Sequence, residues 1–197
     1  MFLFFWQVAQ GKIALQGLQH ISGIDDLDQL QALPTSLQSL TFHRSFNQRL
    51  DEYFMRTNLP KLERLTFGDR FNQPLDQCVS LPRNLIHLTF GWEFNERLDG
   101  IEWPSHLQTL TLGNYFNHTL VGVTLPESLM TLRFGCGFKR SMEGVKLPNG
   151  LQTLIFGNYF NQSLETTIWP TGLQSLSFGH LAFYWLFSIY ADFLIPF

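Results

Sequence analysis

The stretch LTFGDRFNQPL, residues 65–75, decides the fold, because the chain repeats it with small changes. The same pattern reads LTFGWEFNERL at 88–98, LTLGNYFNHTL at 110–120 and LIFGNYFNQSL at 154–164. A Leu-Pro or Trp-Pro pair precedes each copy, and these pairs begin at residues 33, 59, 81, 103, 125, 147 and 169, a spacing of 26 residues and then of 22. A period of roughly 20 to 50 residues indicates a repeat architecture. Seven units therefore account for residues 33–179.

Each unit predicts one short β-strand. In Leu-x-x-Leu-x-Phe-Gly the last apolar residues alternate, which indicates a strand with one buried face. We expect strands at 40–42, 65–67, 88–90, 110–112, 132–134, 154–156 and 176–178, paired in parallel from neighbour to neighbour. Proline cannot donate to a ladder, so the Leu-Pro pair is expected outside the strand. A glycine column is expected to end the strands with positive φ: Gly68, Gly91, Gly113, Gly135, Gly157 and Gly179.

Phenylalanine and asparagine recur at fixed positions and predict structural roles. One column, expected to stack in the core, is Phe46, Phe71, Phe94, Phe116, Phe138 and Phe160; a second is Phe42, Phe67, Phe90, Phe134, Phe156 and Phe178. An asparagine ladder, expected to satisfy backbone groups at the bend, is Asn47, Asn72, Asn95, Asn117 and Asn161. Lys139 interrupts this ladder, so an irregular or hydrated turn is expected there. Asn114, in the same loop as Asn117, is expected to contribute little to stability.

This unit closely resembles the FNIP repeat, known from amoebal and giant-virus proteins and related in style to leucine-rich repeats. The resemblance covers residues 33–179, although the chain has Gln-Arg, Gln-Pro, Glu-Arg, His-Thr or Gln-Ser after Phe-Asn, where the family name would put Ile-Pro. It implies a β-rich, leucine-rich-repeat-like solenoid of about seven 22-residue coils with one parallel β-sheet, and no reaction. Some family members carry an F-box ahead of the repeats. Residues 1–32 show no counterpart of that domain.

The two ends of the chain differ from the repeats. Residues 1–32 are expected to be an N-terminal cap or a degenerate repeat, because their apolar start has no basic n-region typical of a signal peptide. Residues 180–197 form an apolar tail, and its stretch 181–197 is shorter than a membrane span of about 20 residues. Three readings of the tail stay open: a cap over the last coil, a membrane anchor, or a truncated or misread end.

Composition and motifs exclude several function classes. Charged residues make up 15% of the chain, the net charge is −3, and the basic residues are scattered, so no nucleic-acid partner is expected. Five of the six histidines fall at five different repeat phases, His20 lies before the repeats, and no metal-binding spacing occurs. Neither a metal, a cofactor nor a catalytic residue is expected. Cys78 and Cys136 lie in different coils that are not neighbours, roughly 10 Å apart or more in such a stack, so no disulfide is expected and a cytoplasmic location is favoured.

The repeated feature expected to be exposed is the outward face of the strands. Its candidate partner-binding residues are Arg64, Thr66, His87, Thr89, Thr109, Thr111, Thr131, Arg133, Thr153 and Ile155. Threonine and serine also suit solvent-facing strands without any function. Four residues, Arg64, His87, Arg133 and Ile155, distinguish this face from plain rows of threonine and serine. Flat threonine rows could also bind ice, but these four residues interrupt the array that ice binding would require.

The sequence thus predicts a monomeric, non-enzymatic module for protein–protein interaction or scaffolding, with a partner of unknown identity. Two alternatives stay open. One is a membrane-tethered repeat module held by residues 181–197, the part of the chain through which a membrane contact is expected if there is one. The other is the substrate-recognition part of a ubiquitin-ligase-type receptor that lacks its F-box.

Overall fold

The computed structural model describes residues 17–50, 59–75 and 81–180. The first unit is four residues longer than the others, and we expect the additional residues in a loop around 53–58. This segment lies outside the described residues, as do the start of the chain, Cys78 and the apolar stretch 181–197. Within the described residues, no helix has the length and apolar composition that a membrane crossing needs.

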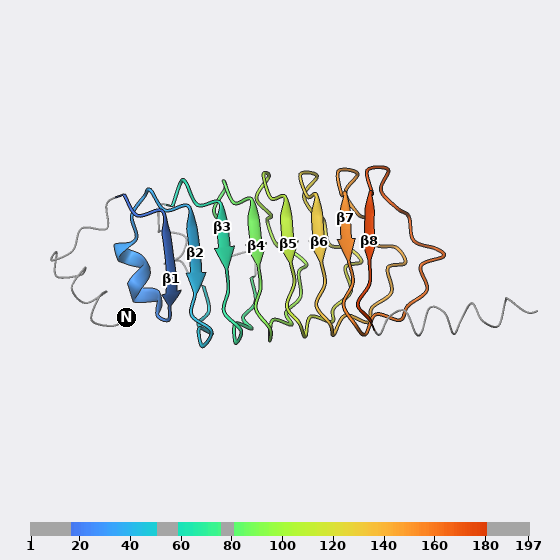
Figure 1. The fold of residues 1–197 in the computed structure, drawn as a ribbon, viewed down its shortest axis with the longest axis horizontal. Helices are drawn as coiled ribbons and strands as arrows, with labels where there is room; N and C mark the ends of the chain where they lie inside the picture. The colour runs from blue at the N-terminus through green and yellow to red at the C-terminus, as the bar shows by residue number, and fades with distance from the viewer. Residues whose placement is uncertain (1–16, 51–58, 76–80, 181–197) are drawn as a thin grey trace, which may run out of the picture.

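Eight strands form one parallel sheet in the described part of the chain, in sequence order (Figure 1). They are β1 (His20–Ile24), β2 (Ser39–Phe42), β3 (Arg64–Thr66), β4 (His87–Thr89), β5 (Thr109–Thr111), β6 (Thr131–Arg133), β7 (Thr153–Ile155) and β8 (Ser175–Ser177). This confirms the parallel solenoid, and each of β2 to β8 begins one residue earlier than the sequence predicts. We refer to each repeat unit as the coil of its strand.

The strand β1 was not predicted, because its segment carries no Leu-Pro marker. It pairs in parallel with β2 at the edge of the sheet, and its register shifts between Ser22 and Ile24. A 3₁₀ helix, η1 (Leu27–Ala32), follows it. The Asp26 side chain accepts the backbone N–H of Asp28 at 3.0 Å and so caps this helix.

The sheet register places the central leucine of each strand against that of the next. Leu65 pairs with Leu88, and Leu88 pairs with Leu110. All the central leucines from Leu40 to Leu154 are fully buried, whereas Leu176 of β8 is 38% exposed. Because side chains alternate along a strand, the residues on either side of each central leucine face away from the core.

The repeat proline opens a tight turn that leads into the strand. The N–H of Leu107 donates to the Pro104 carbonyl at 3.1 Å, and the same bond recurs in the coils of β2, β4, β6, β7 and β8. Proline fits here because the turn needs only its carbonyl, as expected for a residue outside the ladder. In the β3 coil, where the sequence is one residue shorter, Leu62 donates to Leu59 instead. The turn before β3 thus accommodates the missing residue, and the strand keeps its register.

The expectation of positive φ for the glycine column is wrong. The described residues with positive φ are Gly17, Gly23, Gly100, Gly122 and Gly144, all outside the column. The column serves close packing between coils instead. A Cβ on Gly91 would collide with the Gly68 carbonyl oxygen, and one on Gly157 would collide with that of Gly135. Glycine is needed here because consecutive backbones touch at this point.

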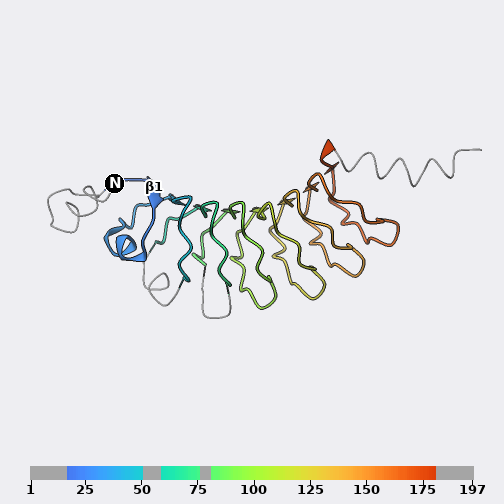
Figure 2. The same ribbon diagram turned by 90° about the horizontal axis from the view of Figure 1, so that it is seen from below.

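Two columns of phenylalanine rings stack through the core. The strand-end column is Phe42, Phe67, Phe90, Phe134, Phe156 and Phe178, with Leu112 in the β5 coil; the turn column is Phe46, Phe71, Phe94, Phe116, Phe138 and Phe160. The turn column is buried throughout. Ring centroids are 5.4 Å apart between Phe67 and Phe90, but 6.2 Å apart between Phe71 and Phe94. The spacing therefore grows with distance from the sheet, and Figure 2 shows the loops spreading apart on the side opposite the strands.

Candidate functional site

The candidate partner-binding residues form two parallel rows on the strand face. The first strand row is Arg64, His87, Thr109, Thr131 and Thr153, and the second strand row is Thr66, Thr89, Thr111, Arg133 and Ile155. Successive members of each row are partners in the sheet register. Arg64 and Arg133 are exposed, and the other eight residues are half-buried.

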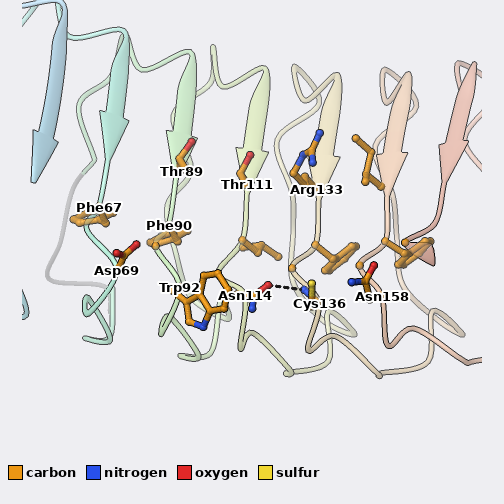
Figure 3. Close-up of a pocket in the computed structure, with 18 of the residues that line it drawn as sticks. Phe67, Asp69, Thr89, Phe90, Trp92, Thr111, Asn114, Arg133, Cys136 and Asn158 are labelled. Atoms are coloured by element: carbon orange, nitrogen blue, oxygen red, sulfur yellow. Dashed lines mark hydrogen bonds between the residues drawn. The ribbon is translucent and has the colours of Figure 1, made fainter. Parts of the chain in front are cut away.

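A groove of about 550 Å³ runs beside the second strand row, across the coils of β3 to β8. Its floor is the strand-end column from Phe67 to Phe178. One wall is the second strand row, all five of whose residues line the groove. The opposite wall is formed by the residues that follow the repeat glycines, and we call it the post-glycine row: Asp69, Trp92, Asn114, Cys136 and Asn158. Figure 3 shows the phenylalanine rings between these two walls.

The first strand row lies apart from this groove. None of its five residues is among the groove-lining residues of the described chain. The sequence therefore predicted one wall of the groove, and it grouped that wall with a second row that belongs to a different part of the strand face.

Sequence reasoning missed the post-glycine row, because these positions vary from unit to unit and were given no role. A signal was present at Trp92, which is a large aromatic side chain at a position where the neighbouring coils have aspartate and asparagine. Its side chain is 54% exposed and its ring contacts that of Tyr115 edge to face, with centroids 6.3 Å apart. Tyr115 is itself 56% exposed. Exposed tryptophan is enriched in protein-binding hot spots.

The groove carries charges of opposite sign at different coils. Asp69 lies in the β3 coil and Arg133 lies on β6, three coils further along the stack, and both side chains are exposed. Trp92 lies between them, in the β4 coil. Ile155 of β7 and Phe178 of the β8 coil continue the lining beyond Arg133. The groove therefore offers an ordered series of distinct contacts along its length.

Beside the groove, the first strand row places His87 next to the positively charged Arg64. Burial lowers the pKa of His87, and the positive charge of the neighbouring Arg64 lowers it further, while Glu63 acts in the opposite direction. The neutral form of His87 is thus favoured.

The asparagine column forms a hydrogen-bond ladder from coil to coil. The Oδ1 atom of Asn47 accepts the N–H of Asn72 at 2.9 Å, Asn72 accepts from Asn95 at 2.8 Å, and Asn95 accepts from Asn117 at 2.9 Å. Each side chain thus satisfies a backbone donor of the next coil, at a bend where the sheet no longer pairs the backbone.

The backbone of Lys139 makes the same hydrogen bond to the ladder as the asparagines do. Its N–H donates to Asn117 Oδ1 at 3.0 Å, so the irregular turn expected there is not observed. Lysine has no side-chain oxygen that could accept the backbone N–H of Asn161, so the ladder stops at Lys139. The Oδ1 atom of Asn161 accepts from the Gln162 side chain at 2.8 Å. The Lys139 ammonium lies 5.2 Å from the centre of the Tyr159 ring, a cation–π contact.

Asn114, which is expected from the sequence to contribute little to stability, makes a hydrogen bond to the next coil. Its Oδ1 atom accepts the backbone N–H of Cys136 at 3.0 Å, and the side chain is half-buried. This contact is visible in Figure 3. Asn114 therefore satisfies a backbone donor of the β6 coil, as Asn117 does a few residues later. Cys136 has a free thiol, which is half-buried in the groove wall.

A serine–histidine contact in the β2 coil closes a turn. His43 Nδ1 and Ser45 Oγ are 2.6 Å apart, and the Ser45 N–H also donates to Nδ1 at 3.3 Å. The Phe46 N–H donates to the His43 carbonyl at 2.9 Å. These local bonds hold the bend after β2. Among the described residues, no group of three His, Cys, Asp or Glu side chains is placed to hold a metal ion.

The fold and the groove define a repeat solenoid of the leucine-rich-repeat type. Residues 71–115, 94–137 and 138–180 match the sequence model of the FNIP repeat. These segments together span more than half of the chain, so the protein belongs to the FNIP repeat family. Repeat proteins of this kind are typically non-catalytic.

A solved structure supports the same class. The crystal structure of CroV588, described as a novel circular LRR protein structure, matches with a TM-score of 0.59 and 34% sequence identity. The match covers 83% of this chain and 27% of CroV588, so this chain spans about a quarter of the length of that protein. Among curated proteins, the comparison finds no match.

Proposed function

We propose that this chain is a non-enzymatic protein-interaction module that binds another protein in the groove between the second strand row and the post-glycine row. Leucine-rich-repeat-like folds commonly mediate protein–protein interaction, and solenoids of this type bind partners along extended surfaces. The observation that carries the proposal is Trp92, which lines the groove and is 54% exposed.

The distribution of binding energy follows from the residue types in the groove. Tryptophan and arginine dominate binding hot spots, whereas serine and threonine rarely do. Trp92 and Arg133 are therefore expected to supply most of the affinity. Thr89 and Thr111 shape the wall beside the rings and contribute complementarity.

Selection from a displayed library tests where the chain binds. Random peptides of about 25 residues would be selected against the full chain, and the Kd of independent binders measured against the Trp92→Ala and Arg133→Ala variants. We expect a loss of affinity of about tenfold or more for either variant, which corresponds to about 1.4 kcal/mol.

A matched control replaces Val121, another exposed apolar residue. Its side chain is 52% exposed and it does not line the groove. Val121→Ala is expected to leave the Kd within about twofold, and thermal melts of all variants would exclude unfolding as the cause. Binders that lose affinity with Val121→Ala, and keep it with both groove variants, would place the binding surface elsewhere and overturn the proposal.

A further inference from the structure

The coil spacing along the groove matches the pitch of an α-helix. Successive rings of the floor are 5.4 Å apart between Phe67 and Phe90, 5.3 Å between Phe134 and Phe156, and 5.5 Å between Phe156 and Phe178. An α-helix advances about 5.4 Å per turn. A helix lying along the solenoid axis would therefore place one turn over each of these coils and stay in register with the rings of the floor.

Other peptide conformations do not repeat with the coils. An extended strand advances roughly 6.6–6.8 Å for each residue pair that faces one side, so it gains more than about 1 Å on every coil. A polyproline II helix advances about 9.3 Å per turn and falls about 1.5 Å short of two coils. Either conformation would lose register within a few coils, whereas a helix can make equivalent contacts with all of them.

The wall residues specify what each turn of such a helix must present. From β3 onward the post-glycine row offers an acid at Asp69, an aromatic ring at Trp92 and an amide at Asn114. The second strand row, on the opposite wall, then offers a base at Arg133 and an apolar side chain at Ile155. At one turn per coil, Asp69 and Arg133 are three turns apart, which corresponds to about 11 residues of a helix. A positive helix N-terminus is also favoured near the Asp69 carboxylate.

We propose that the partner segment is an amphipathic α-helix of about five turns, which lies along the groove with its N-terminus at Asp69. Its inward face carries a basic residue at position i, an apolar residue at i+4, a polar one at i+7, an acidic one at i+11 and an apolar one at i+14. This inference rests on the proposed function, because it assumes that the groove is the binding surface.

A designed peptide of about 20 residues with this pattern tests the inference directly. The peptide would be stapled on its outward face, labelled with a fluorophore and titrated with the full-length protein by anisotropy. We expect binding with a Kd below about 100 μM. A matched peptide with two internal prolines on the outward face breaks the helix and keeps every inward residue, and it is expected to bind at least about tenfold more weakly.

Charge exchange tests both the register and the direction of the helix. A peptide with Glu at i and Lys at i+11 should lose about tenfold in affinity for the wild-type chain. The doubly substituted protein, Asp69→Lys with Arg133→Glu, should recover that loss and disfavour the original peptide. Both side chains are exposed, so these substitutions are compatible with folding.

Several outcomes would overturn the helix. They are equal binding of the proline-containing peptide, no binding of the stapled peptide up to about 1 mM, or no recovery on charge exchange. Sedimentation showing a dimer that dissociates in Trp92→Ala would assign the groove to a second copy of the chain instead. In each of these cases, selected binders that still depend on Trp92 would show that the groove remains the interaction surface and that only the helical partner is wrong.

Discussion

Arg64 lies directly beside His87 in the parallel register of β3 and β4. Two side chains that can both carry a positive charge therefore occupy neighbouring positions on the strand face. Burial and the Arg64 charge both lower the pKa of His87, and only Glu63 opposes them. On its other side, His87 pairs with the uncharged Thr109 of β5. The folded chain thus binds a proton at His87 less tightly than the unfolded chain does.

His87 is therefore expected to make the folded chain less stable as the pH is lowered. Above the ordinary histidine pKa of about 6.5, both states are neutral and His87 has no effect. Below it, the unfolded state takes up the proton first, so the free energy of unfolding decreases until the pH passes the folded pKa. Urea melts at pH 7.5 and 5 should show a larger loss for the wild type than for His87→Gln.

Two further variants check the cause of this pH effect. Arg64→Gln should raise the pKa of His87 and reduce the loss, whereas Glu63→Gln should lower the pKa further. An NMR titration of the His87 ring in the folded protein would measure both shifts. A pKa at or above the ordinary histidine value in the wild type would contradict this account.

Gly91→Ala is expected to cost about 3 kcal/mol or more, because the new Cβ would collide with the Gly68 carbonyl of the preceding coil. Gly122→Ala is the matched control. Gly122 has φ of 84° and nothing within 4 Å of an added Cβ, so only backbone strain of about 1 kcal/mol is expected. Equal losses in urea denaturation would mean that the coils do not touch at Gly91.

Asn117→Ala and Asn114→Ala should each cost about 1–2 kcal/mol, because each leaves a backbone N–H of the β6 coil without its acceptor. Asn149→Ala, at an exposed position, should cost less than about 0.5 kcal/mol. Chemical denaturation of the three variants would measure these changes in the free energy of unfolding. An Asn114→Ala variant as stable as Asn149→Ala would show that its contact with Cys136 contributes nothing.

Lys139→Asn is expected to stabilise the chain by about 0.5–1 kcal/mol, because an asparagine Oδ1 could accept the N–H of Asn161 and extend the ladder. The substitution also removes the cation–π contact with Tyr159. Lys139→Ala removes that contact without adding an acceptor, so the difference in melting midpoint between the two variants reports the ladder bond alone. No difference would mean that Asn161 is satisfied by solvent.

The sequence could predict those parts of the fold that repeat. The alternation of residues around Leu65 and Leu88 is sufficient to predict a strand in each unit. The proline, which cannot join a ladder, indicates where the strand does not extend. The segment of β1 lacks this proline marker and was missed. Gly91 was recognised but misinterpreted, because a glycine serves equally for positive φ and for close backbone contact, and only the neighbouring coil distinguishes the two.

The groove was harder to predict, because it depends on how far side chains on different coils lie from one another. Thr111 and Thr109 are equivalent on a strand, yet only Thr111 lines the groove. The difference arises from the bend after the strand, which brings Asn114 and Trp92 alongside the second strand row. Trp92 shows that an unusual residue at a repeat position is informative even when the repeat itself explains the surrounding residues.

The two phenylalanine columns also determine the radius of curvature of the solenoid. In the β3 coil, Phe67 and Phe71 are 4.0 Å apart, while their distances to the next coil differ, 5.4 Å in one column and 6.2 Å in the other. This wedge corresponds to a tilt of roughly 10° per coil. A few tens of identical coils would then close a ring, the shape that its description gives to CroV588. The two ring spacings set the tilt between neighbouring coils. A larger or smaller side chain in one column would therefore change the curvature of the solenoid, and with it the diameter of any arc built from such coils.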